Sequence, residues 1–140
     1  MTFGSHLIID VVTLATECRW AIIEIVFSGV HDHRWPYGDK IQDYILEEIA
    51  RHKPAGIVFN FLDYKYTWGN ELWGPIFIAC TDLKKKTIRP CSILAMGQTA
   101  ESIKSLLVEA NAREILNIEI FYEKAKALEY LAKRLNDVNG

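Results

Sequence analysis

The residues between positions 64 and 73 hold the densest group of side chains with binding chemistry. Trp68 and Trp73 bracket a short polar stretch, and Tyr64 and Tyr66 stand just before it. Large aromatic side chains either pack in a core or anchor a binding surface. Core packing is expected for some of the four, and an exposed tryptophan among them would indicate an interface.

The polar stretch itself allows two interpretations. Asn70 is a favoured residue type for capping the helix that follows. Alternatively, Gly69 and Asn70 leave an amide-lined anion pocket open at the helix start. Because proline costs little at the first helical position, we expect the helix to begin regularly only at Pro75. The candidate partner- or ligand-binding residues are Thr67, Trp68, Gly69, Asn70, Glu71 and Trp73.

Two other clusters carry charge. In His31-Asp32-His33 two imidazoles flank a carboxylate, but a metal site needs a third or fourth ligand, and no suitably spaced residue supplies one. We expect a solvated loop there and no metal site. Lys84-Lys85-Lys86 and Arg89 are expected at a solvated helix end, where cations complement the helix dipole. Binding of an acidic partner or a phosphate is the alternative for these cations.

Catalytic chemistry has little support. Ser5 stands beside His6 near the chain start, and the Gly-x-Ser-x-Gly, Walker-type and Gly-x-Gly-x-x-Gly patterns are absent. Asp10, Glu24 and Asp63 are single carboxylates in or beside expected strands. No reaction class follows, so we expect a protein that is not an enzyme and carries no cofactor.

Hydrophobic patterning places these residues on alternating strands and helices. Expected strands cover residues 7–14, 20–27, 56–62, 91–96 and 118–122, and the first two form a hairpin. Four helices are expected. Asp39 caps the first, the second covers residues 72–83, and Thr99 caps the third. The last has an inner stripe of Ala125, Leu128, Leu131, Ala132 and Leu135. The order β-β-α-β-α-β-α-β-α predicts an α/β fold, with a mixed sheet of about five strands covered by about four helices.

The core residues follow from the same pattern. Residues 56–62 are apolar apart from Asn60, which is typical of a central strand buried on both faces. The residues expected to be buried include Ile57, Phe59, Ile93, Leu106, Leu107, Leu128 and Leu131.

Composition sets the remaining bounds. The 140 residues suit a single domain, 1–140, and a net charge of -2 gives no global case for binding nucleic acid or anionic membranes. Cys18, Cys80 and Cys91 form no C-x-x-C pair and are expected as reduced thiols. No run reaches transmembrane length and no signal peptide is apparent, so we expect a cytoplasmic protein.

The element order and three local stretches resemble STAS domains, the fold of anti-sigma-factor antagonists. Gly97-Gln98-Thr99-Ala100-Glu101-Ser102 through Leu107 resembles the family's strand-to-helix segment. Ile118 to Phe121 followed by Lys124-Ala125 resembles its last strand and final helix. Phe59-Asn60-Phe61 through Tyr66 to Asn70-Glu71-Leu72 lies where the family has its central strand and functional turn.

In antagonist members that turn usually reads Asp-Ser-Ser-Gly-Leu, or has threonine in place of a serine, and a kinase phosphorylates a hydroxyl there. Here it reads Trp68-Gly69-Asn70-Glu71-Leu72, so Gly69 and Asn70 occupy the acceptor positions and Thr67 is the nearest hydroxyl.

The resemblance therefore implies a non-catalytic regulatory protein-interaction module that is not phospho-switched at this position. It implies an anti-sigma factor, a kinase-like switch protein or a larger signalling assembly as the partner. A sensor domain that binds a nucleotide, lipid or anion is the alternative function, and homo-oligomerisation stays open under both.

Overall fold

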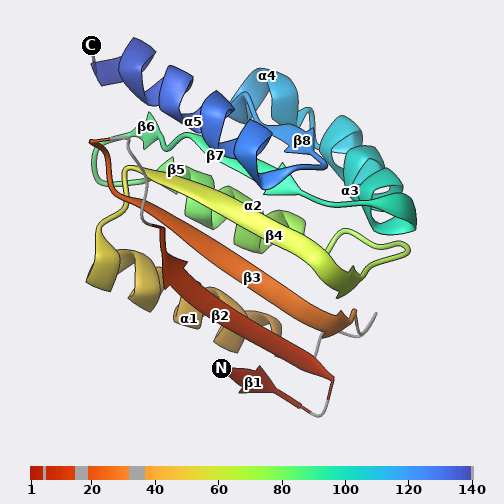
Figure 1. Cartoon of the computed structure of the whole chain (residues 1–140). Coiled ribbons are helices and arrows are strands. Elements are labelled where there is room, and N and C mark those ends of the chain that lie inside the picture. The colour runs from red at the N-terminus through yellow and green to blue at the C-terminus, as the bar shows by residue number, and fades with distance from the viewer. Residues whose placement is uncertain (5, 15–18, 32–36, 140) are drawn as a thin grey trace.

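The molecule is built around one mixed sheet (Figure 1). The computed structural model describes residues 1–4, 6–14, 19–31 and 37–139. Six strands pair in the order β1-β2-β3-β4-β7-β8. Their bounds are β1 Thr2–Phe3, β2 Leu7–Thr13, β3 Ile22–Val30, β4 Gly56–Lys65, β7 Cys91–Leu94 and β8 Glu119–Phe121. β2 pairs antiparallel with both β1 and β3, and β3, β4, β7 and β8 run parallel. The predicted initial hairpin and α/β class are confirmed.

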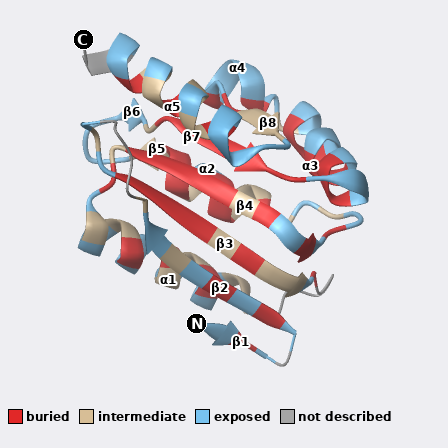
Figure 2. Ribbon diagram, viewed as in Figure 1, coloured by how far each residue is buried: buried red, intermediate tan, exposed pale blue. Residues whose placement is uncertain are grey.

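Helices cover both faces of the sheet, as Figure 1 shows. Their bounds are α1 Gly38–His52, α2 Trp73–Cys80, α3 Gly97–Glu109, α4 Ala112–Leu116 and α5 Lys124–Asn139. α1, α2 and α3 enclose the larger hydrophobic core with one face, and α5 packs on the other face. Because parallel strands need crossover helices, the central strands are buried on both faces. β3, β4 and β7 accordingly each begin with a run of four buried residues (Figure 2). None of the described helices is long and apolar enough to cross a bilayer.

The inner stripe of α5 differs from the predicted one. Ala127, Leu131 and Leu135 pack on the sheet, whereas Leu128 is only half-buried and Ala125 is exposed. Ala125 lies about 120° around the helix from Leu131, since each residue advances about 100°. The helix contacts the sheet along one narrow line, so the neighbouring positions fall on its flanks. The other six residues predicted to be buried are buried.

The end of the second helix was predicted wrongly. α2 stops at Cys80, and Thr81–Asp82 (β5) pairs with Thr87–Ile88 (β6) in a separate two-stranded sheet. The carboxylate of Asp82 accepts the backbone amides of Lys84 and Lys85 at 3.1 Å each, a local bond that competes with helix continuation. The lysines therefore occupy a hairpin turn instead of a helix end.

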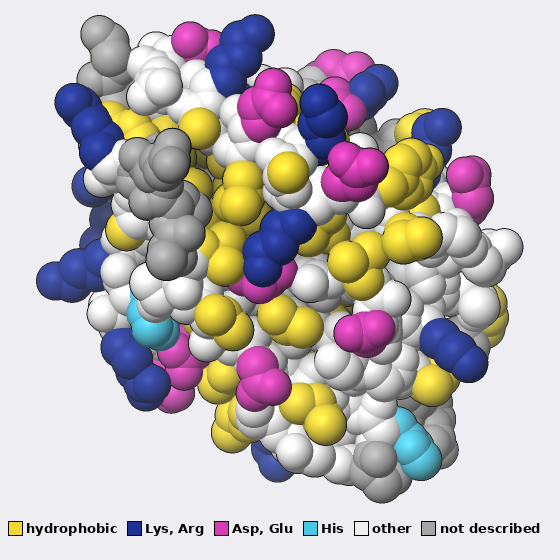
Figure 3. Space-filling model, viewed as in Figure 1, with side chains coloured by type: hydrophobic (Ala, Val, Ile, Leu, Met, Phe, Trp, Pro, Cys, Tyr) yellow, Lys and Arg dark blue, Asp and Glu magenta, His cyan; other side chains and the backbone are white. Residues whose placement is uncertain are grey.

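A buried carboxylate lies on the sheet face that α5 covers only in part. Glu24 on β3 is buried, and its carboxylate bonds to Lys124 Nζ at 3.0 Å and to Asn60 Nδ2 at 2.9 Å. Lys124 begins α5, so this pair ties the helix start to the middle of the sheet. Hydrophobic side chains gather around it on this face (Figure 3), where Ile8, Val12 and Leu62 are exposed.

Candidate functional site

The predicted binding residues lie at the edge of the sheet where four parallel strands end. β4 ends at Lys65, residues 67–72 form a turn, and α2 begins at Trp73. At the same edge, Gly97 begins α3 after β7. In open α/β sheets, ligands bind outside the carboxyl ends of the parallel strands. The turn 67–72 therefore stands where the fold favours a binding site.

Three hydrogen bonds hold the turn in shape. The hydroxyl of Tyr66, a fully buried side chain, donates to the carbonyl of Gly69. The hydroxyl of Ser102 on α3 donates to the carbonyl of Thr67 at 2.7 Å. The amide of Trp73 donates to the carbonyl of Asn70 at 3.2 Å. Both halves of the turn are thus anchored to elements that belong to the core.

A buried histidine lies beneath the turn. The side chain of His31 reaches Tyr64 Oη with Nδ1 at 2.6 Å, and its Nε2 lies 3.4 Å from a carboxylate oxygen of Glu71. The His31 amide also donates to the Lys65 carbonyl at 2.8 Å, which extends the β3–β4 pairing by one step. The expectation of a solvated loop is therefore wrong for His31, which is 4% exposed. Asp32 and His33 lie outside the described residues.

Tyr66 completes this buried cluster. Its ring meets the His31 ring edge-on, with centroids 4.7 Å apart. Burial, followed by the negative charges of Glu71 and Glu109, raises the pKa of Tyr66 to about 12. The phenol therefore stays protonated at neutral pH and remains a donor to the Gly69 carbonyl.

Gly69 adopts a backbone conformation that other residues rarely reach. Its φ is +112°, and a Cβ at this position would lie 2.2 Å from a carboxylate oxygen of Glu71. Glycine is the default residue where both constraints meet. The same Glu71 carboxylate faces His31, so the glycine makes room for the contact between the turn and the buried histidine.

Thr99 joins α3 to the end of β4 and does not cap its helix. Met96 is the N-cap residue, and no side chain caps the helix start. The Thr99 hydroxyl donates to the Tyr64 carbonyl at 2.8 Å and accepts the Tyr66 amide at 3.2 Å. Asp39 likewise lies inside the first turn of α1, whose N-cap is Tyr37. Both predicted caps are wrong.

The candidate residues divide by exposure. Trp68 projects from the turn and is 62% exposed, and Thr67 and Asn70 are exposed beside it. Trp73 is half-buried against the core and against the Phe77 ring, 5.6 Å away. Glu71 is half-buried through its contact with His31. The turn thus presents one large apolar side chain, Trp68, on a well-anchored base.

Two amides at the start of α2 are already bonded within the chain. The helix begins at Trp73, two residues before the predicted Pro75, and its N-cap is Leu72 with no side-chain cap. The amide of Trp73 bonds to Asn70, that of Ile76 bonds to Leu72, and Pro75 has no amide hydrogen. Asn70 contributes its carbonyl instead of the predicted side-chain cap.

The two charged clusters of the sequence are described in different measure: only His31 of the first lies within the described residues, whereas all of the second does. Among residues 1–4, 6–14, 19–31 and 37–139, no three potential metal ligands gather. Arg89 is separated from the three lysines: its guanidinium donates to the carbonyls of Ala79 at 2.5 Å and Pro54 at 3.2 Å. It thereby complements the end of α2, a role that the sequence had suggested for the lysine run.

Comparison with known proteins bears on the fold. No family model matches the chain, and no curated protein matches its sequence significantly. The crystal structure of an anti-sigma factor antagonist from Mycobacterium paratuberculosis superposes with a TM-score of 0.58 at 12% identity, covering 87% of this chain and 94% of that one. The predicted resemblance is therefore confirmed at the level of structure: this chain has the STAS-like fold of an anti-sigma factor antagonist.

Proposed function

We propose that this protein is a non-catalytic regulatory module that binds a partner protein through the turn 67–72 and the first residue of α2, Trp73. The observation that carries the proposal is Trp68, a tryptophan 62% exposed at the tip of a turn whose backbone is anchored on both sides. Tryptophan is among the residues most enriched in binding hot spots, and a preformed turn loses little entropy on binding. Thr67, Asn70, Glu71 and Trp73 form the surroundings of this anchor.

The fold supports the class of partner. A solved protein with this fold is named an anti-sigma factor antagonist, so we propose an anti-sigma factor, a kinase-like switch protein or a signalling assembly as the partner. Cys80 and Cys91 are buried free thiols, which supports a reducing compartment such as the cytoplasm. The bonds of the Trp73 and Ile76 amides leave fewer donors at the start of α2 for the alternative, an anion sensor at this turn.

The test begins with capture of partners from the native lysate by the tagged chain. Each captured protein is then purified and titrated against the wild type, Trp68→Ala and Leu83→Ala. Leu83 is an exposed apolar residue in the β5–β6 hairpin, so its variant controls for general surface hydrophobicity.

We expect Trp68→Ala to weaken binding about thirtyfold, which corresponds to about 2 kcal/mol, because the anchor is lost. Leu83→Ala should leave affinity unchanged. Equal affinities of the wild type and Trp68→Ala for every captured protein would contradict the proposal.

A further inference from the structure

The hairpin of β5 and β6 combines apolar and cationic side chains at its tip. Leu83 is 78% exposed, more than any other large hydrophobic side chain that the structure describes. The lysines 84–86 follow it directly, and all three are exposed. These four residues form the loop between Asp82 and Thr87, which are the last paired residues of the hairpin. One leucine and three cations are therefore presented together at one exposed tip.

The positive charge of this tip is only partly compensated. Residues 81–89 contain four cationic side chains and one carboxylate, that of Asp82. Asp82 Oδ1 accepts the amides of Lys84 and Lys85 at 3.1 Å each, so this oxygen is engaged by the loop backbone. The lysines 84–86 form no ion pair with any residue that the structure describes. Because charges are screened beyond about 8–10 Å, this local excess acts at the tip although the whole chain has a net charge of -2.

The cationic surface continues toward the start of β4. Arg89, after the hairpin, donates to the Pro54 carbonyl at 3.2 Å, so Lys53 stands at the same edge of the sheet. Lys and Arg side chains follow the left edge of the molecule in Figure 3, the side on which Figure 1 places β5 and β6. The turn 67–72 lies at the other end of β4. The hairpin and the turn therefore face away from each other.

Two of these lysines have a backbone conformation that disfavours lysine. Among the non-glycine residues described, those with positive φ are Lys53, Lys86, Asn111 and Asn117. Asparagine tolerates this left-handed region, whereas it is costly for side chains such as lysine. Lys86 has a φ of +55° within the tip itself. A lysine at a position where glycine would be more stable indicates that its charge, and not the stability of the turn, accounts for its presence.

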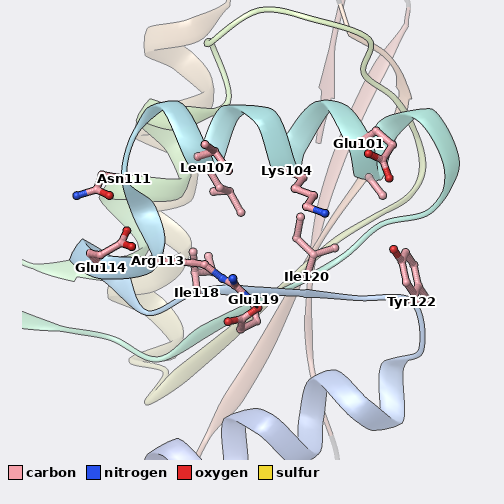
Figure 4. Close-up of a pocket in the computed structure, with 12 residues that line it drawn as sticks. Glu101, Lys104, Leu107, Asn111, Arg113, Glu114, Ile118, Glu119, Ile120 and Tyr122 are labelled. Carbon is pink, nitrogen blue, oxygen red and sulfur yellow. Dashed lines mark hydrogen bonds and ion pairs between the residues drawn. The ribbon is translucent and has the colours of Figure 1, made fainter.

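A lysine elsewhere on the surface has different surroundings. Lys104 lines a groove of about 480 Å³ between α3 and β8 (Figure 4). Glu101, Glu114 and Glu119 line the same groove, and Glu119 pairs with Arg113 at 2.6 Å. Charges of both signs meet in that groove, in contrast to the hairpin tip. Lys104 is therefore a matched control for the loss of one lysine.

We propose that the β5–β6 hairpin binds the surface of a lipid bilayer that contains anionic lipids. The lysines 84–86 lie among the lipid phosphates, and Leu83 enters the boundary between headgroups and acyl chains. A bilayer fits this tip better than other anionic surfaces do. The lysine ammonium is a point charge without the fixed fork of arginine, and the tip has no aromatic ring on which a base could stack. An exposed leucine among lysines gains from a fluid apolar phase without needing a matching pocket. The surface lies away from Trp68 and does not depend on the function proposed for it.

Flotation of the full chain with lipid vesicles measures this binding. The chain should bind vesicles of phosphatidylcholine with about 30% phosphatidylglycerol, but not vesicles of phosphatidylcholine alone. Binding seen at about 0.1 M salt should be lost at about 0.5 M, because screening shortens the reach of the charges. Lys84→Gln and Lys85→Gln should each lower the partition coefficient about fivefold, or about 1 kcal/mol, whereas Lys104→Gln should not.

The apolar contact is tested by a second matched pair. Leu83→Ala should lower the partition coefficient at least about threefold, since it removes methylene and methyl groups from the acyl boundary. Val108→Ala shortens a side chain that is 71% exposed on α3 and should bind as the wild type does.

Lys86→Gly separates charge from stability. The glycine variant should bind the anionic vesicles about fivefold more weakly and yet unfold at a higher urea concentration, because glycine accepts the positive φ. Lys86→Gln keeps the backbone cost, so it should lose the same binding without this gain in stability.

Four results would overturn the proposal. The first is no flotation at about 5 mM anionic lipid, a concentration that captures even marginal membrane binding. The second is equal binding to both kinds of vesicle, and the third is an equal effect of Lys84→Gln and Lys104→Gln. The fourth is tighter binding to polyglutamate or to a DNA duplex than to vesicles at the same charge concentration, lost in Lys84→Gln, because an acidic protein or a nucleic acid would then be the occupant.

Discussion

At the scale of single residues, the shape of the turn depends on Gly69. With φ at +112° and a Cβ that would meet Glu71 at 2.2 Å, Gly69→Ala should cost about 1–3 kcal/mol of stability. Gly97→Ala is the matched control, because Gly97 has a φ of +58° but open space around its Cβ. Urea unfolding of both variants measures the difference. Equal losses would show that backbone strain alone, and not the contact with Glu71, sets the requirement.

Tyr66 makes the free energy of unfolding depend on pH in the alkaline range. Burial raises the pKa of Tyr66 to about 12 in the folded chain, against an ordinary value of 10.0 for tyrosine. Below pH 10 both states hold the proton and the contribution is complete. Between pH 10 and 12 only the unfolded state releases it, so stability falls by about 1.4 kcal/mol per pH unit, about 2–3 kcal/mol in all.

The variant Tyr66→Phe should not lose stability between pH 10 and 12 in this way. The variant should be less stable than the wild type at pH 9, where it lacks the hydrogen bond to Gly69, by about 1 kcal/mol. The gap should close or reverse at pH 11 in urea unfolding. Tyr122→Phe, which removes a hydroxyl from an exposed ring, is the control and should follow the wild type. A gap that stays constant from pH 9 to pH 11 would contradict the assignment.

Residue chemistry alone could identify the aromatic turn, but not which of its aromatic side chains are buried and which are exposed. Tyr64 and Tyr66 are buried and Trp68 is exposed, a division that depends on the direction in which β4 leaves the sheet. His31 was missed as a core residue, although a signal was present. Ile23, Ile25 and Phe27 alternate along β3, and the same period of two places His31 on the buried face.

At the scale of elements, α5 tests how narrow a helix–sheet contact is. Leu131→Ala should cost about 2–5 kcal/mol, because Leu131 is fully buried against Ile22, Val58 and Leu94. Leu128→Ala, one turn earlier on the same helix, should cost roughly half as much or less, since its side chain is half-buried and leaves a smaller cavity. Thermal or urea unfolding of both variants measures the two costs. Similar losses would mean that α5 is rotated from the position described.

Elements were predictable where a long hydrophobic pattern repeats and less so where local bonds decide. The strands β2, β3, β4 and β7 follow from their apolar runs. The two-residue strands β5 and β6 and the short α4 have too few residues to show a period. For β5, the cause is Asp82, which bonds to neighbouring amides and ends the helical run at a point that hydropathy does not mark.

At the scale of the whole molecule, the order of strands and helices predicted the fold better than any single motif did. Parallel pairing of β3, β4, β7 and β8 follows from the helices between them, and this pairing brings the turn 67–72 to the same edge as Gly97. Contacts across that edge were not predictable. The bonds from Ser102 to Thr67 and from His31 to Tyr64 join residues more than 30 positions apart, and no local pattern encodes them.

Phosphorylation of Thr67 should not control how the molecule binds its partner. Phosphorylation switches a surface when the phosphate meets free amides or cations. Thr67 is exposed, but it stands six residues before Trp73, where α2 begins, and the Trp73 amide is already bonded to Asn70. Thr67→Ala and Thr67→Glu should therefore change affinity for a captured partner by less than about threefold, whereas Trp68→Ala in the same titration loses about thirtyfold. Phosphopeptide mass spectrometry on protein from its own cells completes the test. A substantial fraction phosphorylated at Thr67, together with a large effect of Thr67→Glu on affinity, would restore a phosphorylation switch to this turn.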